Sequence, residues 1–176
     1  MNDMASTLWL TGLSGAGKTS LAKALQVALQ QESVGVYVLD GDVLRTGLCR
    51  DLGFSPQDRS ENIRRAAEVA KVLNDVGVTA VAALISPLAA DREMARALIG
   101  EQRFFEVHIA TSLTVCEQRD IKGLYRRARA GELPDFTGVS APYEIPAEPH
   151  LRLDLGVLSL DEAVAICLRQ LRQFSA

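Results

Sequence analysis

The chain has 176 residues, of which 48% are hydrophobic, and its formal net charge at pH 7 is −3. This length is enough to bury a substantial core, and the hydrophobic content excludes a disordered chain. The small negative charge gives no general attraction to nucleic acid, and no apolar run reaches membrane-spanning length, so we expect a protein that binds neither nucleic acid nor membrane.

The N-terminal residues lack the basic start and apolar core of a signal peptide, which predicts a soluble, cytoplasmic protein. Cys49, Cys116 and Cys167 are widely spaced and odd in number. They form neither a metal-ligand pattern nor a disulfide framework, which favours buried, reduced thiols that pack as small hydrophobic side chains.

Hydrophobic periodicity predicts strands that alternate with helices. The strands are expected at residues 7–11, 35–39, 78–85, 104–110 and 151–153, and the helices include 18–31, 56–76 and 160–173. This order favours an α/β fold of parallel βαβ units with helices on both faces of the sheet. Nothing inside the chain resembles a linker, so we expect a single domain over residues 1–176. Ligands of such folds bind beyond the carboxyl ends of the strands.

Directly after the first predicted strand, Gly12, Gly17, Lys18 and Thr19 fill the pattern G-x-x-x-x-G-K-[ST]. Between a strand and a helix this pattern is typical of a phosphate-binding loop. Its glycines let backbone N–H groups point at phosphate oxygens, and the following helix N-terminus adds partial positive charge. Lys18 would reach the terminal phosphates and Thr19 would hold magnesium. The alternative is a plain glycine turn, which does not need the Lys-Thr pair.

The second predicted strand leads into VLDGDVLR, which places Asp40 and Asp42 on either side of a glycine. In a purely structural interpretation, Asp42 caps the next helix and Asp40 hydrogen-bonds the turn. Beside a magnesium-nucleotide site, one carboxylate can instead orient metal-bound water while the other accepts the proton of an attacking hydroxyl. We favour the functional interpretation because two acids occur together there.

The third predicted strand ends in VAALIS, with Ser86 where many phosphate-loop enzymes carry the Asp that helps to hold magnesium. We infer that the carboxylates have moved to the neighbouring strand. This arrangement suits small-molecule kinases better than switch GTPases, and the chain has no guanine-reading Asn-Lys-x-Asp motif.

Ser55 and Pro56 mark the start of the helix at 56–76. Arg59 and Asn62 lie three residues apart, so they project together from its first turns. They would be unremarkable as surface residues. Next to an exposed Phe54, they could hold a planar ligand that carries a negative group.

Five of the nineteen basic residues fall within eleven positions: Arg119, Lys122, Arg126, Arg127 and Arg129. A solvated helix face is the ordinary explanation of such a run. The stretch AGELPDFTGVSAPYEIP that follows is too long for a simple connection. A basic helix that leads into this stretch predicts a lid over residues 119–145, which closes over a triphosphate and excludes water. Phe136, without an evident partner in a local core, is expected to stack on a ligand base.

Six blocks together resemble the adenylyl-sulfate kinase family, which phosphorylates adenosine 5′-phosphosulfate (adenylyl sulfate, APS). They are GLSGAGKTS, LDGDVLR, GFSPQDRSENIRR, ISPLAADR, CEQRDIKGLYRRARAGE and FTGVSAPYE. The resemblance extends from about residue 7 to residue 154. It implies a three-layer P-loop NTPase fold, with a mainly parallel five-stranded sheet covered by helices on both faces and a lid segment.

The resemblance also implies the ligand-binding residues. ATP would be bound by Gly12, Leu13, Ser14, Gly15, Ala16, Gly17, Lys18, Thr19, Ser20 and Arg119. Adenylyl sulfate would be held by Asp42, Arg45, Phe54, Arg59, Asn62, Ile85, Ser86, Lys122 and Phe136, with its adenine between the two phenylalanine rings. Thr19 and Asp40 would lie at Mg²⁺, and the catalytic residues would be Lys18, Asp40, Asp42, Ser86 and Lys122.

Descriptions of the family have assigned the serine that matches Ser86 as a phosphorylated intermediate. In-line transfer needs only positioning and charge stabilisation, whereas a covalent serine needs its own activating base. The only histidines, His108 and His150, are distant from Ser86 in sequence. We therefore expect Ser86 to bind substrate or metal-bound water, and the phosphoserine remains an alternative.

The predicted reaction transfers the γ-phosphoryl group of MgATP to the 3′-hydroxyl of adenylyl sulfate, in sulfate activation, with Asp42 or Asp40 taking the proton. One alternative is another small-molecule or nucleotide kinase on the P-loop fold. The other is a non-catalytic nucleotide-sensing domain of a sulfate-activating assembly, which would be expected to lose Lys18 or the paired aspartates. The family suggests a homodimer, and ATP sulfurylase, fused or separate, as a partner.

The chain departs from the family pattern in two places. The lid contains GELPDFTG where relatives commonly carry a lysine-glycine pair before the phenylalanine, so Pro134 and Asp135 are expected to stiffen the lid and remove a positive charge. Eleven residues precede the loop motif. We therefore expect no control by the longer N-terminal arm that many relatives have.

Overall fold

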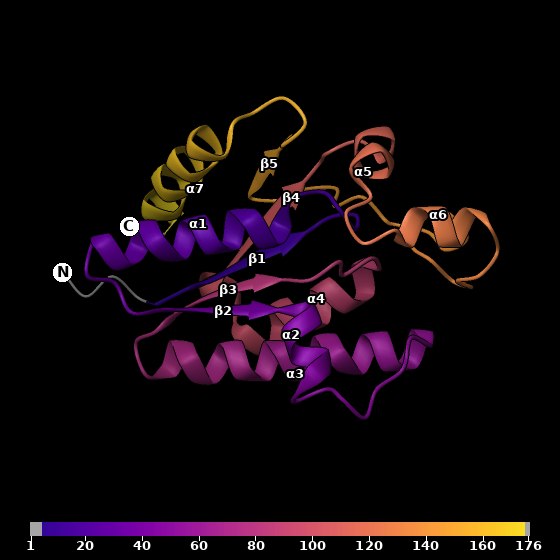
Figure 1. Cartoon of the computed structure of the whole chain (residues 1–176). Coiled ribbons are helices and arrows are strands. Elements are labelled where there is room, and N and C mark those ends of the chain that lie inside the picture. Colours follow the sequence, from indigo (N-terminus) through magenta and orange to yellow (C-terminus); the bar gives the residue numbers. More distant parts are fainter. Residues whose placement is uncertain (1–4, 175–176) are drawn as a thin grey trace.

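Five parallel strands form the central sheet of the computed structural model, which describes residues 5–174 (Figure 1). They are β1 (Thr7–Thr11), β2 (Val36–Asp40), β3 (Thr79–Ala83), β4 (Phe104–Ile109) and β5 (Leu151–Leu153). Their order across the sheet is β2-β3-β1-β4-β5, and every pairing is parallel. The predicted α/β class is therefore confirmed, with a sheet that is wholly parallel.

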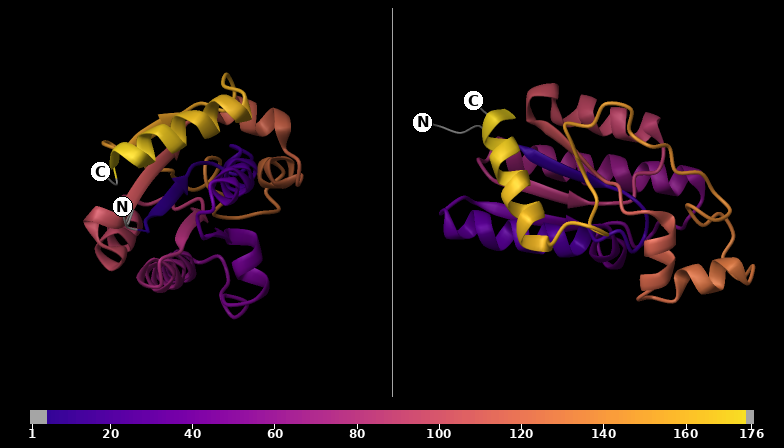
Figure 2. Two further views of the ribbon diagram at one scale, coloured as in Figure 1. Left: turned by 90° about the vertical axis from the view of Figure 1, so that its left-hand side faces the viewer. Right: turned by 90° about the horizontal axis from the view of Figure 1, so that it is seen from above.

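Helices cover both faces of this sheet, as Figures 1 and 2 show. One face carries α1 (Lys18–Gln31) and α7 (Leu160–Phe174), and the other carries α2 (Gly41–Thr46), α3 (Pro56–Asp75) and α4 (Ala89–Ile99). A 3₁₀ turn, η1 (Glu101–Arg103), precedes β4. The short helices α5 (Leu113–Arg119) and α6 (Leu124–Arg129) lie beyond the carboxyl ends of β1 and β3 (Figure 1).

The central strand β1 shows how the sequence divides the interior into two cores. Successive side chains of a strand point to opposite faces of the sheet. Leu8 and Leu10 accordingly pack in the core beneath α1 and α7, whereas Trp9 packs with Ala66 and Ala70 of α3 in the other core. All five residues of β1 are buried because helices cover both faces. This two-sided burial explains the unbroken apolar run that precedes the glycine motif.

Two sequence-based predictions of secondary structure are wrong in detail. The third strand ends at Ala83 instead of residue 85, because the backbone turns out of the sheet before Ser86, whose φ is +46°. The basic run is also two helices instead of one. Gly123 adopts a left-handed φ of +65° between α5 and α6, and Asp120 accepts hydrogen bonds from the backbone N–H groups of Tyr125 and Arg126.

Within residues 5–174, the structure contains no helix with both the length and the apolar character needed to cross a membrane. The thiols of Cys49, Cys116 and Cys167 are buried and unpaired, as the sequence predicted. Burial raises the pKa of the Cys167 thiol to about 12, so this thiol is protonated at neutral pH.

Candidate active site

A cavity of about 920 Å³ opens at the carboxyl ends of β1, β2 and β3. Most of the residues predicted from the sequence line it: Ser14, Gly15, Gly17, Lys18, Thr19, Ser20, Asp40, Asp42, Arg45, Phe54, Arg59, Asn62, Ile85, Ser86, Arg119, Lys122 and Phe136. Gly12, Leu13 and Ala16 do not line it: Gly12 lies against Ile109, Leu13 lines a separate cavity beside Gly138, and Ala16 is fully buried. The parallel topology thus brings five separate parts of the sequence to one edge of the sheet.

Two glycines of the loop between β1 and α1 have backbones that no other residue would adopt without strain. Gly12 has φ +154°, and a Cβ atom there would lie 2.6 Å from the carbonyl oxygen of Ile109. Gly17 has φ +109°, and its Cβ atom would lie 2.7 Å from Leu155 Cδ1. The loop can therefore pass tightly between β4 and the segment after β5 only with glycine at both positions.

Lys18 begins α1 and is almost completely buried, with 8% of its surface exposed. Its Nζ donates hydrogen bonds to the carbonyl oxygens of Gly12 (2.8 Å) and Leu13 (2.6 Å). Burial lowers the pKa of this amine from its ordinary value of 10.5 to about 8, because desolvation disfavours the charged form. A ligand phosphate at the loop would restore the lost stabilisation of the ammonium group.

The two aspartates that flank Gly41 have different surroundings. Asp40 is 9% exposed, and its Oδ2 accepts a hydrogen bond from Thr19 Oγ1 at 2.7 Å. Its Oδ1 accepts from the backbone N–H groups of Asp42 (2.9 Å) and Val43 (3.4 Å), so Asp40 is the N-cap of α2. Asp42 leaves 69% of its side chain exposed and contacts Lys122 Nζ. The helix cap considered for Asp42 thus belongs to Asp40, and Asp42 presents its carboxylate to the cavity.

Oxygen atoms suitable for Mg²⁺ lie beside the phosphate-binding loop. Within residues 5–174 no group of three or more His, Cys, Asp or Glu side chains could hold a metal ion. Mg²⁺ does not require such a group, because it commonly takes one or two protein oxygens and completes its shell with phosphates and water. The adjacent oxygens of Thr19 and Asp40 fit that requirement.

The far end of the cavity combines an aromatic ring with two guanidinium groups. Phe54 is 64% exposed, and the guanidinium carbon of Arg45 lies 4.3 Å from its ring centroid. Arg59 donates hydrogen bonds to the Phe54 carbonyl oxygen (2.9 Å), to the Asp135 carbonyl oxygen (2.7 Å) and to Thr137 Oγ1 (3.2 Å). Arg59 therefore links the Phe54 loop directly to the predicted lid.

Asn62 and Ser86 form the buried inner wall of this end. Asn62 is 5% exposed, and its Oδ1 has no hydrogen-bond partner among the described residues. Such an orphaned buried acceptor is rare unless a ligand or water satisfies it. Ser86 is 2% exposed, and its Oγ accepts a hydrogen bond of 3.0 Å from Trp9 Nε1. Its hydroxyl is thus held by the sheet from behind.

The predicted lid, residues 119–145, contributes Arg119, Lys122 and Phe136 to the cavity. Arg119 donates a 2.5 Å hydrogen bond to the Leu155 carbonyl oxygen. The prediction that Phe136 has no core partner is wrong, since its ring packs edge-on against Tyr125, with 5.1 Å between centroids. Tyr125 in turn donates to the Ser14 carbonyl oxygen at 2.7 Å, which connects the lid to the glycine loop.

Several residues that line the cavity were not predicted from the sequence. Besides Tyr125, they include Ile121, Leu124, Leu155, Leu158 and Leu160. Leu155 and Leu158 follow the short strand β5, so the rule that ligands bind beyond carboxyl ends could have identified them. No sequence signal marked Tyr125, because its role depends on contacts with Ser14 and Phe136 across the fold.

Comparisons with known proteins identify the family of this chain. A family model described as adenylylsulphate kinase matches residues 4–154. The adenylyl-sulfate kinase of Shewanella amazonensis is 56% identical over 158 residues, which cover 90% of this chain and 80% of that protein. The corresponding enzyme of Prochlorococcus marinus is 55% identical over 157 residues, 89% of this chain and 78% of that protein.

Among solved structures, the APS kinase of Mycobacterium tuberculosis in complex with AMPPNP and APS superposes with a TM-score of 0.93. It is 46% identical, and the match covers 96% of this chain and 98% of that chain. The family match extends over most of the sequence, and the two relatives are matched over about four fifths of their own length. The chain therefore belongs to the adenylylsulphate kinase family.

Proposed function

We propose that this chain transfers the γ-phosphoryl group of ATP to the 3′-hydroxyl of adenosine 5′-phosphosulfate and releases ADP and 3′-phosphoadenylyl sulfate. The observation that carries the proposal is one cavity with a phosphate-binding loop at one end and an aromatic, arginine-rich site at the other. A kinase needs its donor phosphates and its acceptor hydroxyl together in such a water-restricted space.

At the loop end, we assign the residues 12–20 to the ATP phosphates. Backbone N–H groups and the N-terminus of α1 bind the phosphate oxygens, and Lys18 places its ammonium group against the transferring phosphoryl group. Thr19 and Asp40 would hold Mg²⁺, which when bound neutralises charge on the phosphate oxygens. Arg119 lies beside the loop, with Nη1 3.5 Å from the carbonyl oxygens of Gly15 and Ala16, where it can contact the nucleotide.

At the opposite end, we assign adenylyl sulfate to the site around Phe54. Phe54 and Phe136 offer aromatic faces to adenine, and Arg45, Arg59 and Lys122 offer positive charge to the phosphosulfate group. The orphaned Oδ1 of Asn62 accepts a hydrogen bond from the bound nucleotide. The Ile85–Ser86 segment forms the floor of the same pocket, where Ser86 binds the substrate without being phosphorylated. Among residues 5–174, the hydrogen bonds of its Oγ are with Trp9 Nε1 and the Leu84 carbonyl oxygen and with no carboxylate or imidazole, which favours this role over a phosphoserine.

We assign the general base to Asp42 and the structural and metal-binding role to Asp40. Both oxygens of Asp40 already accept hydrogen bonds from Thr19 and the start of α2, whereas the Asp42 carboxylate is open to the cavity. In the reaction the 3′-oxygen forms a bond to the γ-phosphorus as the bond from that phosphorus to the ADP oxygen breaks. Asp42 takes the hydroxyl proton, and Lys122 compensates its charge before the substrate binds.

The proposal is tested with labelled ATP, adenylyl sulfate and the variant Asp42→Asn. The wild type should produce labelled 3′-phosphoadenylyl sulfate, and D42N should lower kcat by about 10²-fold or more, as removal of a general base does. Asp161→Asn, at the exposed start of α7, is the matched control and should behave as wild type. Tight ATP binding without labelled product from the wild type would refute the function. A kcat within about threefold of wild type in D42N would refute the role of Asp42.

The family resemblance also implies a homodimer and an association with ATP sulfurylase. We propose that the chain forms a homodimer and works with ATP sulfurylase, the enzyme that supplies adenylyl sulfate. Light scattering should give twice the mass of one chain. Co-purification with ATP sulfurylase tests the second association, and a monomer at micromolar concentration would refute the first.

A further inference from the structure

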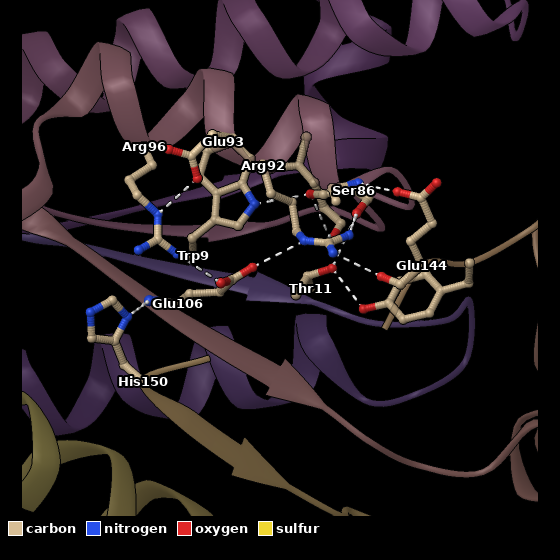
Figure 3. Close-up of polar contacts among 12 residues, drawn as sticks. Trp9, Thr11, Ser86, Arg92, Glu93, Arg96, Glu106, Glu144 and His150 are labelled. Atoms are coloured by element: carbon tan, nitrogen blue, oxygen red, sulfur yellow. Dashed lines mark hydrogen bonds and ion pairs between the residues drawn. The ribbon is translucent and has the colours of Figure 1, made fainter. Parts of the chain in front are cut away.

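One buried guanidinium group contacts three separate segments behind the substrate end of the cavity (Figure 3). Arg92 lies in the first turn of α4 and is 5% exposed. Its Nη1 donates to the Ser86 carbonyl oxygen and its Nη2 donates to the Glu144 carbonyl oxygen, each at 2.8 Å. Its Nε lies 3.1 Å from Glu106 Oε1. A buried charge of this kind persists only where it is paired and hydrogen-bonded.

Glu106 reaches Arg92 because of its position in β4. Phe105, Val107 and Ile109 face the α1 and α7 side, so Glu106 points to the opposite side, where α4 lies. Glu106 is 4% exposed, and its second oxygen lies 3.1 Å from Nη2 of Arg96. The strand thus provides a fixed negative charge that holds the Arg92 fork in one orientation.

The first segment held by Arg92 is the floor of the substrate pocket. Ser86 has a left-handed φ of +46°, a backbone conformation that is strained for a residue with a Cβ atom. Three groups outside this turn hold it: Arg92 and Thr11 donate to its carbonyl oxygen at 2.8 and 3.4 Å, and Trp9 donates to its Oγ. Loss of the charged donor would remove the strongest of these contacts.

The second segment is the C-terminal end of the predicted lid. Besides its carbonyl contact with Arg92, Glu144 donates its backbone N–H to the Pro87 carbonyl oxygen at 2.8 Å. Its carboxylate accepts from the backbone N–H of Ala89 at 2.6 Å. The hydroxyl of Tyr143 lies 2.8 Å from Thr11 Oγ1. The lid therefore returns to the body of the protein on the same short stretch that forms the pocket floor.

We infer that Arg92 is a positioning residue for the reaction: it fixes the pocket floor at Ser86 and the lid anchor at Glu144 in a single geometry. This inference rests on the proposed function. Arg92 lies behind the wall of the cavity and acts through the two carbonyl groups. Its planar fork, with donors pointing in three directions, suits this role, whereas a lysine ammonium at the end of a flexible chain cannot bridge all three partners.

The test compares Arg92→Lys with Arg96→Lys. Both changes keep the charge, and both residues contact Glu106, but Arg96 contacts neither Ser86 nor Glu144. We expect R92K to lower kcat/KM for adenylyl sulfate by about tenfold or more through misplacement of the pocket, with the dissociation constant of a non-hydrolysable ATP analogue within about twofold of wild type. R96K should keep both values. The lid of R92K should also be cleaved faster by trypsin than the lid of R96K.

Three outcomes would overturn the inference: equal kinetics of R92K and R96K, an equal loss of affinity for both nucleotides, or an unchanged rate of lid cleavage. Glu106→Gln is the second variant, because it removes the charge behind Arg92 with little change of shape, and it should weaken adenylyl sulfate use in the same selective way. If neither R92K nor E106Q folds, Arg92 is a stability residue and the inference is wrong. Failure of the wild type to phosphorylate adenylyl sulfate would instead refute the proposed function, and the comparison of lid cleavage would still decide the role of Arg92.

Discussion

The two ends of the cavity are built in different ways. The phosphate end is lined by one short continuous stretch, residues 14–20 with the exception of Ala16. The substrate end is assembled from α2, the Phe54 loop, α3, the turn at Ser86 and the lid. The first depends on local backbone geometry, and the second depends on side chains that only the fold brings together.

The two aromatic rings assigned to adenine also differ from each other, in how far each is buried. Phe54 is 64% exposed and has arginine side chains over its ring. Phe136 is half-buried, packs against Tyr125 and touches the α1 and α7 core. Phe54 can therefore be specialised for a ligand, whereas Phe136 also stabilises the lid.

The strongest test of the phosphate end is Lys18→Met, which keeps a long side chain but removes the charge. We expect kcat to fall by about 10²–10³-fold, because a preorganised positive charge at the transferring phosphoryl group is lost. Steady-state assays with ATP and adenylyl sulfate measure the change. Lys23→Met, at an exposed position of the same helix, is the control. A K18M enzyme with near-normal turnover would show that loop backbone alone carries phosphate binding.

The substrate end is tested with Phe54→Ala and Phe136→Ala. Each should weaken adenylyl sulfate binding by about 5–150-fold, the range that corresponds to loss of about 1–3 kcal/mol of base stacking. F54A should change the free energy of unfolding by less than about 1 kcal/mol, since its ring is exposed. F136A should lose about 1–3 kcal/mol, because its ring is partly buried.

Titration calorimetry and urea denaturation measure these two effects, and Phe54→Tyr, which keeps the ring, should retain binding. Equal losses of stability in F54A and F136A would contradict the division of roles between the two rings.

The smallest expected effect is a pH dependence of ATP binding. Because the Lys18 pKa is about 8 in the ligand-free protein, the amine is mostly neutral above that pH, and phosphate binding must return a proton to it. Affinity for a non-hydrolysable ATP analogue should therefore fall about tenfold between pH 7 and pH 9, and adenylyl sulfate binding should change less. K18M should lose this dependence. A wild-type affinity that is flat across this range would show that Lys18 stays charged without ligand.

The sequence by itself determined the parallel α/β order, the glycine loop and the presence of two acids after β2. Each depends on neighbours in sequence: strand alternation, glycines that permit a left-handed backbone, and a helix that starts directly after the loop. The family resemblance added the residues of the substrate end.

Only the tertiary structure separated Asp40, which caps α2 and contacts Thr19, from Asp42, which remains open to the cavity. It also showed that the basic run forms two helices separated at Gly123 and that Phe136 packs against Tyr125. The contacts of Arg92 with the carbonyl groups of Ser86 and Glu144 were likewise visible only in the folded chain. These features depend on contacts between residues that lie far apart in sequence, and packing selects such contacts only when the whole chain has folded.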